Sequence, residues 1–166
     1  MRECGDCTEC CRLVGVNEIS KPEGVDCPHC DPGVGCQIYD TRPNACRAWS
    51  CLWLQDLFPE HLKPNVVNMC GSFVPAETSG GHKISLILLS ATDTIPMNPE
   101  MFAFGKFLSY QAAVQFTHGV HRQIWQDGER VVEFNRKTQR FHFEVRGGKF
   151  VNVRVTDRID VKEVDA

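Results

Sequence analysis

Residues 4–11 read C-G-D-C-T-E-C-C, and this run is the strongest indication of how the first third of the chain folds. Its first three cysteines are each separated by two residues, a spacing that lets one turn of backbone aim two sulfurs at a single metal ion. Gly5 suits such a turn because glycine adopts backbone angles that other residues avoid. Cys11 follows Cys10 directly, and neighbouring side chains in an irregular segment tend to diverge. We therefore expect these two to serve neighbouring metal sites, or one of them to be buried as a small apolar residue.

The ten cysteines are distributed unevenly, since all except Cys70 lie between residues 4 and 51. The segment 4–51 is rich in glycine and proline and shows little apolar periodicity, so it cannot bury a core of its own. Short segments of this kind are usually held together by metal ions or disulfides. Cys70 is expected to be a core residue. The candidate metal ligands are Cys4, Cys7, Cys10, Cys11, Cys27, Cys30, Cys36, Cys46 and Cys51, with His29 in reserve.

The redox compartment bears on the choice between metal and disulfides. Residues 1–4 have no apolar core and no small-residue cleavage site, which argues against a secretory signal. The longest apolar stretch, residues 84–89, is too short to cross a bilayer. We expect a cytoplasmic protein, and the cytoplasm keeps thiols reduced. Two alternatives to metal ligation stay open: a disulfide framework, which the even number of cysteines favours, and reduced cysteines that are merely buried.

The spacing also bears on the identity of the metal. Three cysteines at two-residue intervals match the C-x2-C-x2-C start of bacterial ferredoxin ligation, although the fourth cysteine of that pattern follows after three further residues rather than at once. The thiols also outnumber the four ligands of one closed zinc site. They would suffice for one cluster plus one zinc ion, or for two tetrahedral sites. These features favour an iron–sulfur cluster over zinc as the cofactor.

Two helices are expected, with a loop-rich connector at residues 59–82 between them. Asn44 is a candidate cap for a helix over residues 45–58, where large apolar residues recur every three to four positions. The dipeptide Asn98-Pro99 is typical of a second helix start, with a cap followed by proline at the first helical position. The apolar residues at helical spacing behind it are Met101, Phe104, Leu108, Ala112 and Phe116.

Strand signals dominate the remainder of the chain. Residues 84–90 suit a buried strand, and residues 130–135, 140–145 and 149–155 suit antiparallel strands. Gly147-Gly148 supplies a tight hairpin turn between the last two.

The expected fold is therefore α+β, with an irregular cysteine-rich metal-binding module at residues 1–58 followed by a helix and a small antiparallel sheet. After the connector, residues 83–166 would form the α+β part, either as a separate unit or as one compact unit with the module.

The run at residues 4–11, together with G-C-Q-I-Y-D-T-R-P-N-A-C-R at residues 35–47, resembles the CxxCxxCC family of zinc- or iron-chelating domains. Relatives of flagellin lysine N-methylase share that motif. The resemblance covers roughly residues 4–54 and is specific because both parts occur together. It does not extend beyond residue 60, so the methylase activity is not implied. The ligands that the resemblance implies are Cys4, Cys7, Cys10, Cys11, Cys27, Cys36 and Cys46, whereas Cys30 and Cys51 are additions to the pattern.

Two further groups of residues are candidate parts of a site. Arg42 and Arg47 flank Cys46, where a cation would offset the charge of a thiolate centre and favour the ligating form of the thiols. Ordinary surface ion pairs explain both arginines equally well. His118 and His121 are three residues apart, a spacing that metals use on a helix, but a pair without a carboxylate is usually structural.

Charge and motif content exclude several functions. The net charge is −3 and lysine and arginine form no run, which disfavours nucleic acid as a partner. The sequence has no phosphate-binding glycine loop, no dinucleotide fingerprint and no serine-nucleophile motif, and whether the chain is an enzyme stays open. The leading hypothesis is an iron–sulfur protein in electron transfer or as an accessory to protein modification. The alternative is a zinc-stabilised module that binds a protein partner without catalysis; neither involves a membrane.

Overall fold

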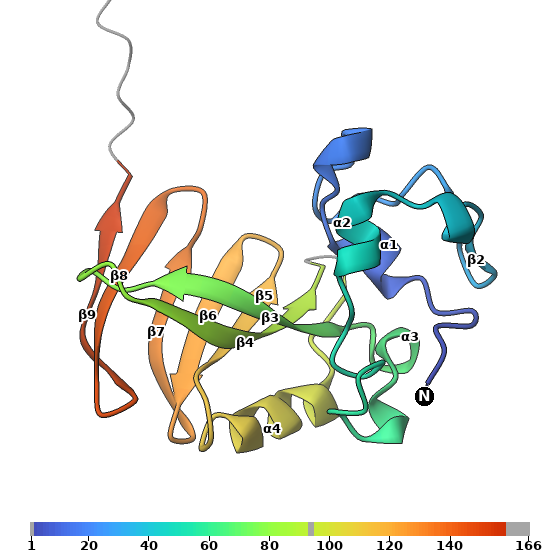
Figure 1. Ribbon diagram of the computed structural model, residues 1–166. Coiled ribbons are helices and arrows are strands. Elements are labelled where there is room, and N and C mark those ends of the chain that lie inside the picture. The colour runs from blue at the N-terminus through green and yellow to red at the C-terminus, as the bar shows by residue number, and fades with distance from the viewer. Residues whose placement is uncertain (1, 93–94, 159–166) are drawn as a thin grey trace, which may run out of the picture.

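In the computed structural model, which describes residues 2–92 and 95–158, a cysteine-rich segment of short elements lies beside one end of a curved sheet (Figure 1). Residue 1 of the predicted metal-binding module and residues 159–166 of the predicted α+β part lie outside the described residues. The elements of this segment are α1 (Glu9–Leu13), η1 (Asn17–Ile19), β1 (Cys30–Asp31), β2 (Gly35–Cys36), η2 (Tyr39–Thr41) and α2 (Asn44–Ala48). Two short helices, η3 (Glu60–Leu62) and α3 (Pro64–Val67), connect the segment to the sheet.

The cysteine-rich segment has almost no apolar interior. Of its hydrophobic side chains between residues 2 and 50, the buried ones are Leu13 and Val16, each 5% exposed. This confirms the expectation that the segment cannot bury a core of its own. Its cohesion must come from polar contacts, from the neighbouring sheet or from a bound ion.

The main sheet has the strand order β3-β4-β5-β6-β7, in which only the pairing of β4 with β5 is parallel. A parallel pair needs a crossover, and helix α4 (Pro99–Leu108) supplies it. The α+β class is confirmed, but the sheet is larger than expected and is mixed. Its strands are β3 (Cys70–Glu77), β4 (Lys83–Ala91), β5 (Val114–His118), β6 (His121–Gln126) and β7 (Glu129–Asn135). A separate hairpin follows, formed by β8 (Gln139–Arg146) and β9 (Lys149–Asp157).

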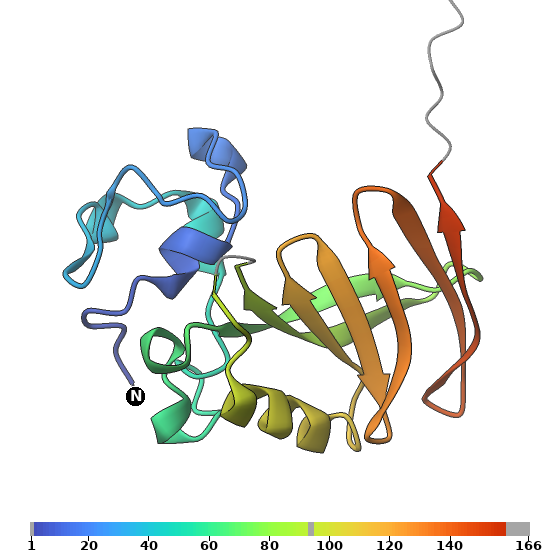
Figure 2. The same cartoon turned by 180° about the vertical axis from the view of Figure 1, so that it is seen from behind.

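Helix α4 covers one face of the sheet, and the main core lies between them (Figure 2). A Cβ atom at Gly105 would stand 2.4 Å from the ring of Phe116 and 2.5 Å from Leu89, so glycine is what lets the helix come this close. Met101 and Val114 are fully buried in the same contact. The opposite face of the sheet is not covered by this helix.

The helix predicted over residues 45–58 is wrong. Helix α2 ends at Ala48, and its cap position is Pro43 rather than Asn44. The backbone is extended at Trp49, and the N–H of Leu52 then donates to the carbonyl of Gly71 at 2.8 Å. Leu52 is 1% exposed, so burial against β3 outweighs the helical periodicity of the sequence.

The second predicted helix is correct at its start and too long. The side chain of Asn98 accepts hydrogen bonds from the N–H groups of Glu100 and Met101, each at 3.0 Å, as a cap residue should. The helix ends at Leu108, however, and Phe116 lies in β5. That residue is buried because β5 pairs with β4, which the local pattern of apolar residues does not reveal.

The prediction of a loop-rich connector at residues 59–82 is also wrong in part, because β3 occupies residues 70–77. Pro75 is tolerated there since β3 is an edge strand. The other predicted strands are confirmed, each within a slightly longer one: β4, β7, β8 and β9. Gly147 and Gly148 form the expected hairpin turn with φ of +56° and +77°. Among the described residues no helix is long and apolar enough to cross a membrane.

Candidate metal centre

Two of the C-x2-C pairs, Cys4/Cys7 and Cys27/Cys30, form the same local structure. The N–H of Cys7 donates to the carbonyl of Cys4 at 3.0 Å, and the N–H of Cys30 donates to the carbonyl of Cys27, also at 3.0 Å. Each pair is therefore a tight turn. Gly5 has a φ of +54°, the unusual angle expected for it. Turns of this kind bring the two sulfurs of a pair to one side of the backbone, as a tetrahedral ion requires.

Backbone contacts then bring distant cysteines together. The N–H of Cys27 donates to the carbonyl of Cys11 at 3.1 Å, and Cys30 stands opposite Cys36 in the β1–β2 pair. All ten cysteines lie in the described part of the chain and are free thiols, of which Cys51 and Cys70 are buried.

Five thiols form what we call the outer group. The thiol of Cys11 is in hydrogen-bonding contact with Cys10, which raises its pKa, and burial raises that pKa further. Burial and the neighbouring Cys11 thiol raise the pKa of Cys30 to about 12. Burial also raises the pKa of Cys46, on α2, as do the negative charges of nearby thiolates. The members of the outer group are Cys11, Cys27, Cys30, Cys36 and Cys46.

Four thiols form an inner group on the side of the main core. Burial raises the pKa of Cys4, and the Cys51 thiol raises it further. Burial likewise raises the pKa of Cys7, although the N–H groups of Glu9 and Asn65 oppose this effect at its sulfur. The members of the inner group are Cys4, Cys7, Cys51 and Cys70.

Cys51 is the member of the inner group whose thiolate is favoured. The hydrogen bond from the Cys70 thiol lowers the pKa of Cys51 to about 6, and the N–H of Leu54, 3.4 Å from the sulfur, lowers it as well. The pKa of Cys70 is raised, because its proton is shared with Cys51 and its side chain is fully buried. Cys70 is thus the core residue that the sequence predicts, but it also contacts a candidate ligand, which the sequence does not indicate.

The adjacent Cys10 links Cys11 of the outer group with the inner group. Cys11 contacts Cys30 in the outer group, whereas Cys10 is close enough to raise the pKa of Cys70 in the inner group. Both adjacent residues are half-buried. This arrangement is the one expected if they serve neighbouring sites.

Three cations surround the thiols. The guanidinium of Arg42 lies 3.9 Å from the ring centre of Tyr39 and lowers the pKa values of Cys4 and Cys46. The Nε atom of Arg42 is buried and has no hydrogen-bond partner among the described residues. Arg47, in contrast, is exposed and donates to Asn44 at 3.1 Å. Of the two flanking arginines, only Arg42 therefore faces the cysteines.

Lys21 and Lys63 complete the set of cations, and no sequence pattern singles them out. Lys21 is 4% exposed, donates to the carbonyls of Arg12, Val14 and Pro22, and lies close enough to Cys11 to interact with its charge. Lys63, paired with Asp6 at 2.8 Å, interacts with Cys4 and Cys7. Lys63 reaches the thiols through a contact between residues 57 positions apart, which no local pattern encodes, whereas the hydrogen bonds of Lys21 span at most 9 positions.

The two histidine candidates differ from the cysteines. His118 and His121 stand opposite each other at the β5–β6 turn rather than on a helix, and His118 Nε2 lies 2.9 Å from the carbonyl oxygen of Ile95. For His29 the structure gives a backbone contact, since its carbonyl accepts a hydrogen bond from the N–H of Gln37.

In the part of the chain that the structure describes, no group of three or more His, Cys, Asp or Glu side chains is arranged to hold a metal ion. The thiols instead contact one another in pairs. The donor set nevertheless fits a thiophilic ion, because thiols on tight turns, backbone N–H donors to sulfur and cations nearby are what a thiolate centre needs.

Comparison with models of protein families, with curated proteins and with solved structures finds no match for the chain.

Proposed function

We propose that this chain binds metal through its clustered cysteines and holds an iron–sulfur cluster, used in electron transfer or in support of an enzyme that modifies proteins. The observation that carries the proposal is the position of Lys21, Arg42 and Lys63 around two groups of thiols. Lys63 already has Asp6 as an ionic partner, but among the described residues neither Lys21 nor Arg42 forms a salt bridge, and neutral thiols would give these two cations no ionic partner. Four thiolates outweigh the charge of one divalent ion, so a thiolate centre is negative and stabilises the cations around it.

The number and grouping of the thiols favour two neighbouring centres over one. The outer group has enough sulfurs for a four-ligand site, and Cys10 would add a fourth ligand to Cys4, Cys7 and Cys51 of the inner group. The resemblance of residues 4–47 to the CxxCxxCC family points in the same direction, toward zinc or iron. When bound, an iron–sulfur cluster would supply one-electron chemistry, whereas zinc would supply cohesion. The proposal places the protein in the cytoplasm, where thiols stay reduced.

The second candidate function is a zinc-held module that binds a protein partner and has no catalytic activity. It is favoured by the burial pattern of residues 2–50, in which only Leu13 and Val16 are buried apolar side chains. A structural ion can replace an apolar core in such a segment, and then needs no other role.

The colour and metal content of anaerobically purified protein test the proposal against this second candidate. We expect a brown protein that contains iron and acid-labile sulfide and that bleaches with dithionite, because thiolate-bound iron–sulfur clusters absorb visible light and are reducible. A colourless protein with near-stoichiometric zinc by elemental analysis would remove the iron–sulfur assignment and leave the zinc-held module. Protein without either metal would contradict both.

Replacing Arg42 tests the electrostatic part of the proposal. We expect Arg42→Gln to weaken metal retention by roughly tenfold, as is typical for residues that support metal ligands from outside the coordination sphere. Competition with a chromophoric chelator measures the change. Arg47→Gln is the matched control, since its side chain is exposed and bonds to Asn44, and it should retain metal like the unaltered protein. Equal losses in the two variants would contradict a specific role for Arg42.

A further inference from the structure

The face of the sheet that α4 does not cover carries a cleft of about 440 Å³. Leu13 and Trp49 of the cysteine-rich segment line one side of it, and residues of β3, β4 and β5 line its floor. Its volume falls within the usual range for small-molecule sites.

The floor of the cleft carries a row of polar side chains among apolar residues such as Phe73, Val74 and Leu88. Strand register places Cys70, Ser90, Thr117 and Arg122 opposite one another in a row across β3, β4, β5 and β6. Thr117 is 2% exposed and Arg122 is 5% exposed, so this end of the row is buried although it is polar, whereas Ser90 is half-buried. The row begins at the Cys70 thiol, which contacts Cys51, and ends at the Arg122 guanidinium.

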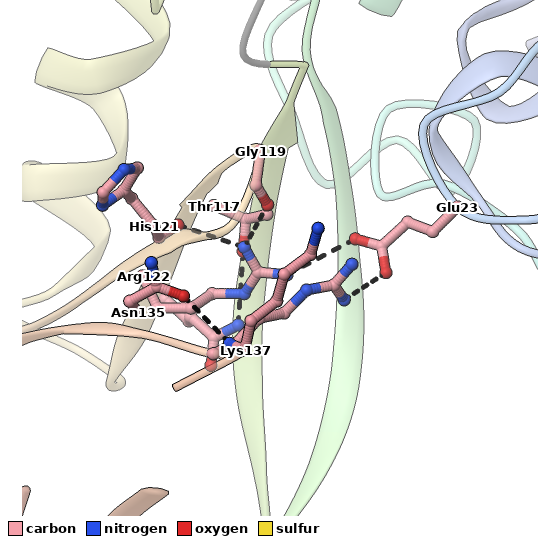
Figure 3. Close-up of polar contacts among 9 residues, drawn as sticks. Glu23, Thr117, Gly119, His121, Arg122, Asn135 and Lys137 are labelled. Carbon is pink, nitrogen blue, oxygen red and sulfur yellow. Dashed lines mark hydrogen bonds and ion pairs between the residues drawn. The ribbon is translucent and has the colours of Figure 1, made fainter. Parts of the chain in front are cut away.

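The charges at the far end of the row do not balance. Two arginines, Arg122 and Arg136, share the single carboxylate of Glu23, which reaches them from the cysteine-rich segment (Figure 3). Arg136 takes that carboxylate in a close ion pair, whereas the contact of Arg122 with it is long, at 3.4 Å. Arg122 also donates to the carbonyls of Gly119 and His121, at 2.7 and 3.0 Å, which fixes its position.

The excess positive charge is held in a buried place, where it is costly. Burial and the nearby charge of Arg136 together lower the pKa of Arg122 to about 10, although the Glu23 carboxylate partly offsets both effects. A second anion beside the guanidinium would relieve this cost.

We propose that this cleft binds a small molecule that carries one oxyanion group, a carboxylate or a phosphate, between Arg122 and Arg136. Planar guanidinium groups match both oxyanions through paired N–H donors. The polar floor formed by Ser72, Ser90 and Thr117 would accept a hydroxyl- or amide-bearing body. Because the floor reaches Cys70, the ligand would lie between the arginine pair and the inner group of thiols.

Titration of the purified protein with acetate and with inorganic phosphate, each at constant ionic strength, tests the proposal and distinguishes the two head groups. Amide shifts in nuclear magnetic resonance spectra locate the site, and we expect them to change at Ser72, Thr117 and Arg122 for at least one probe. Two variants should then act in opposite directions. Arg136→Gln removes a guanidinium and should weaken binding by roughly tenfold, whereas Glu23→Gln removes the competing carboxylate and should strengthen it by roughly fivefold.

Lys137→Gln is the matched control, since it removes the same charge from the exposed neighbour of Arg136 and should leave binding unchanged within about twofold. The proposal is overturned if neither probe shifts these amides, if Lys137→Gln weakens binding as much as Arg136→Gln, or if Glu23→Gln weakens it. Arg136 and Glu23 are each 39% exposed, so both variants should fold. The test does not depend on the metal, whose content is measured separately in every variant.

Discussion

Removal of the bound metal is expected to unfold residues 4–51 while the sheet keeps its structure. The reason is the contrast in burial between the two parts. Besides Cys51 at its end, the segment has two buried apolar side chains, Leu13 and Val16, whereas the main core includes fully buried residues such as Met101 and Val114. Structural metal ions commonly supply on the order of 10 kcal/mol to folding, which is comparable to the whole stability of a typical domain.

Hydrogen exchange before and after treatment with a strong chelator measures this effect amide by amide. The N–H of Cys7 closes the first cysteine turn, and the N–H of Cys27 bonds the second cysteine turn to Cys11 in α1. Both N–H groups should exchange on the order of 1,000-fold faster without metal. The control is the N–H of Ile87, which donates to Ala113 across the β4–β5 junction and should change little. Equal acceleration everywhere would mean that the two parts unfold together. Unchanged exchange at Cys7 would mean that the segment stands without an ion.

We expect a single replacement in either thiol group to remove only part of the bound metal. If the groups are separate centres, Cys7→Ser should remove the inner one and Cys46→Ser the outer one, each with about half of the metal, because a four-ligand site rarely survives on three thiolates. Elemental analysis of the purified variants gives the stoichiometry. Complete loss from either single variant would indicate one shared centre instead of two.

Cys70→Ser is the control for these variants. We expect it to retain its metal and its solubility, because the serine hydroxyl still donates a hydrogen bond to Cys51 from the same buried position on β3. Metal content as low as that of Cys7→Ser would make Cys70 a ligand and would change the composition of the inner group.

Local signals in the sequence predicted local structure well. The cap at Asn98, the turn at Gly147-Gly148 and the strand over residues 84–90 are all in the structure. The cap and the turn depend on contacts within a few residues, and the strand has its apolar signal within its own seven residues. The errors occurred where a distant strand competes with the local pattern. Leu52 leaves the expected helix to bond Gly71. Phe116 belongs to β5 because β4 is there to pair with it.

The sequence alone also determined the turns of the candidate metal centre and the lack of an apolar core around them. Spacing and glycine angles act within one turn, so Cys4 and Cys7 must lie on the same side of the backbone wherever the rest of the chain goes. Only the tertiary structure decided which pairs of thiols are in contact, that Lys21 is buried beside them, and that Arg122 forms an ion pair with Glu23. These contacts join residues up to 99 positions apart. They form only after strand register and burial have fixed the whole fold, so no short stretch of the chain encodes them.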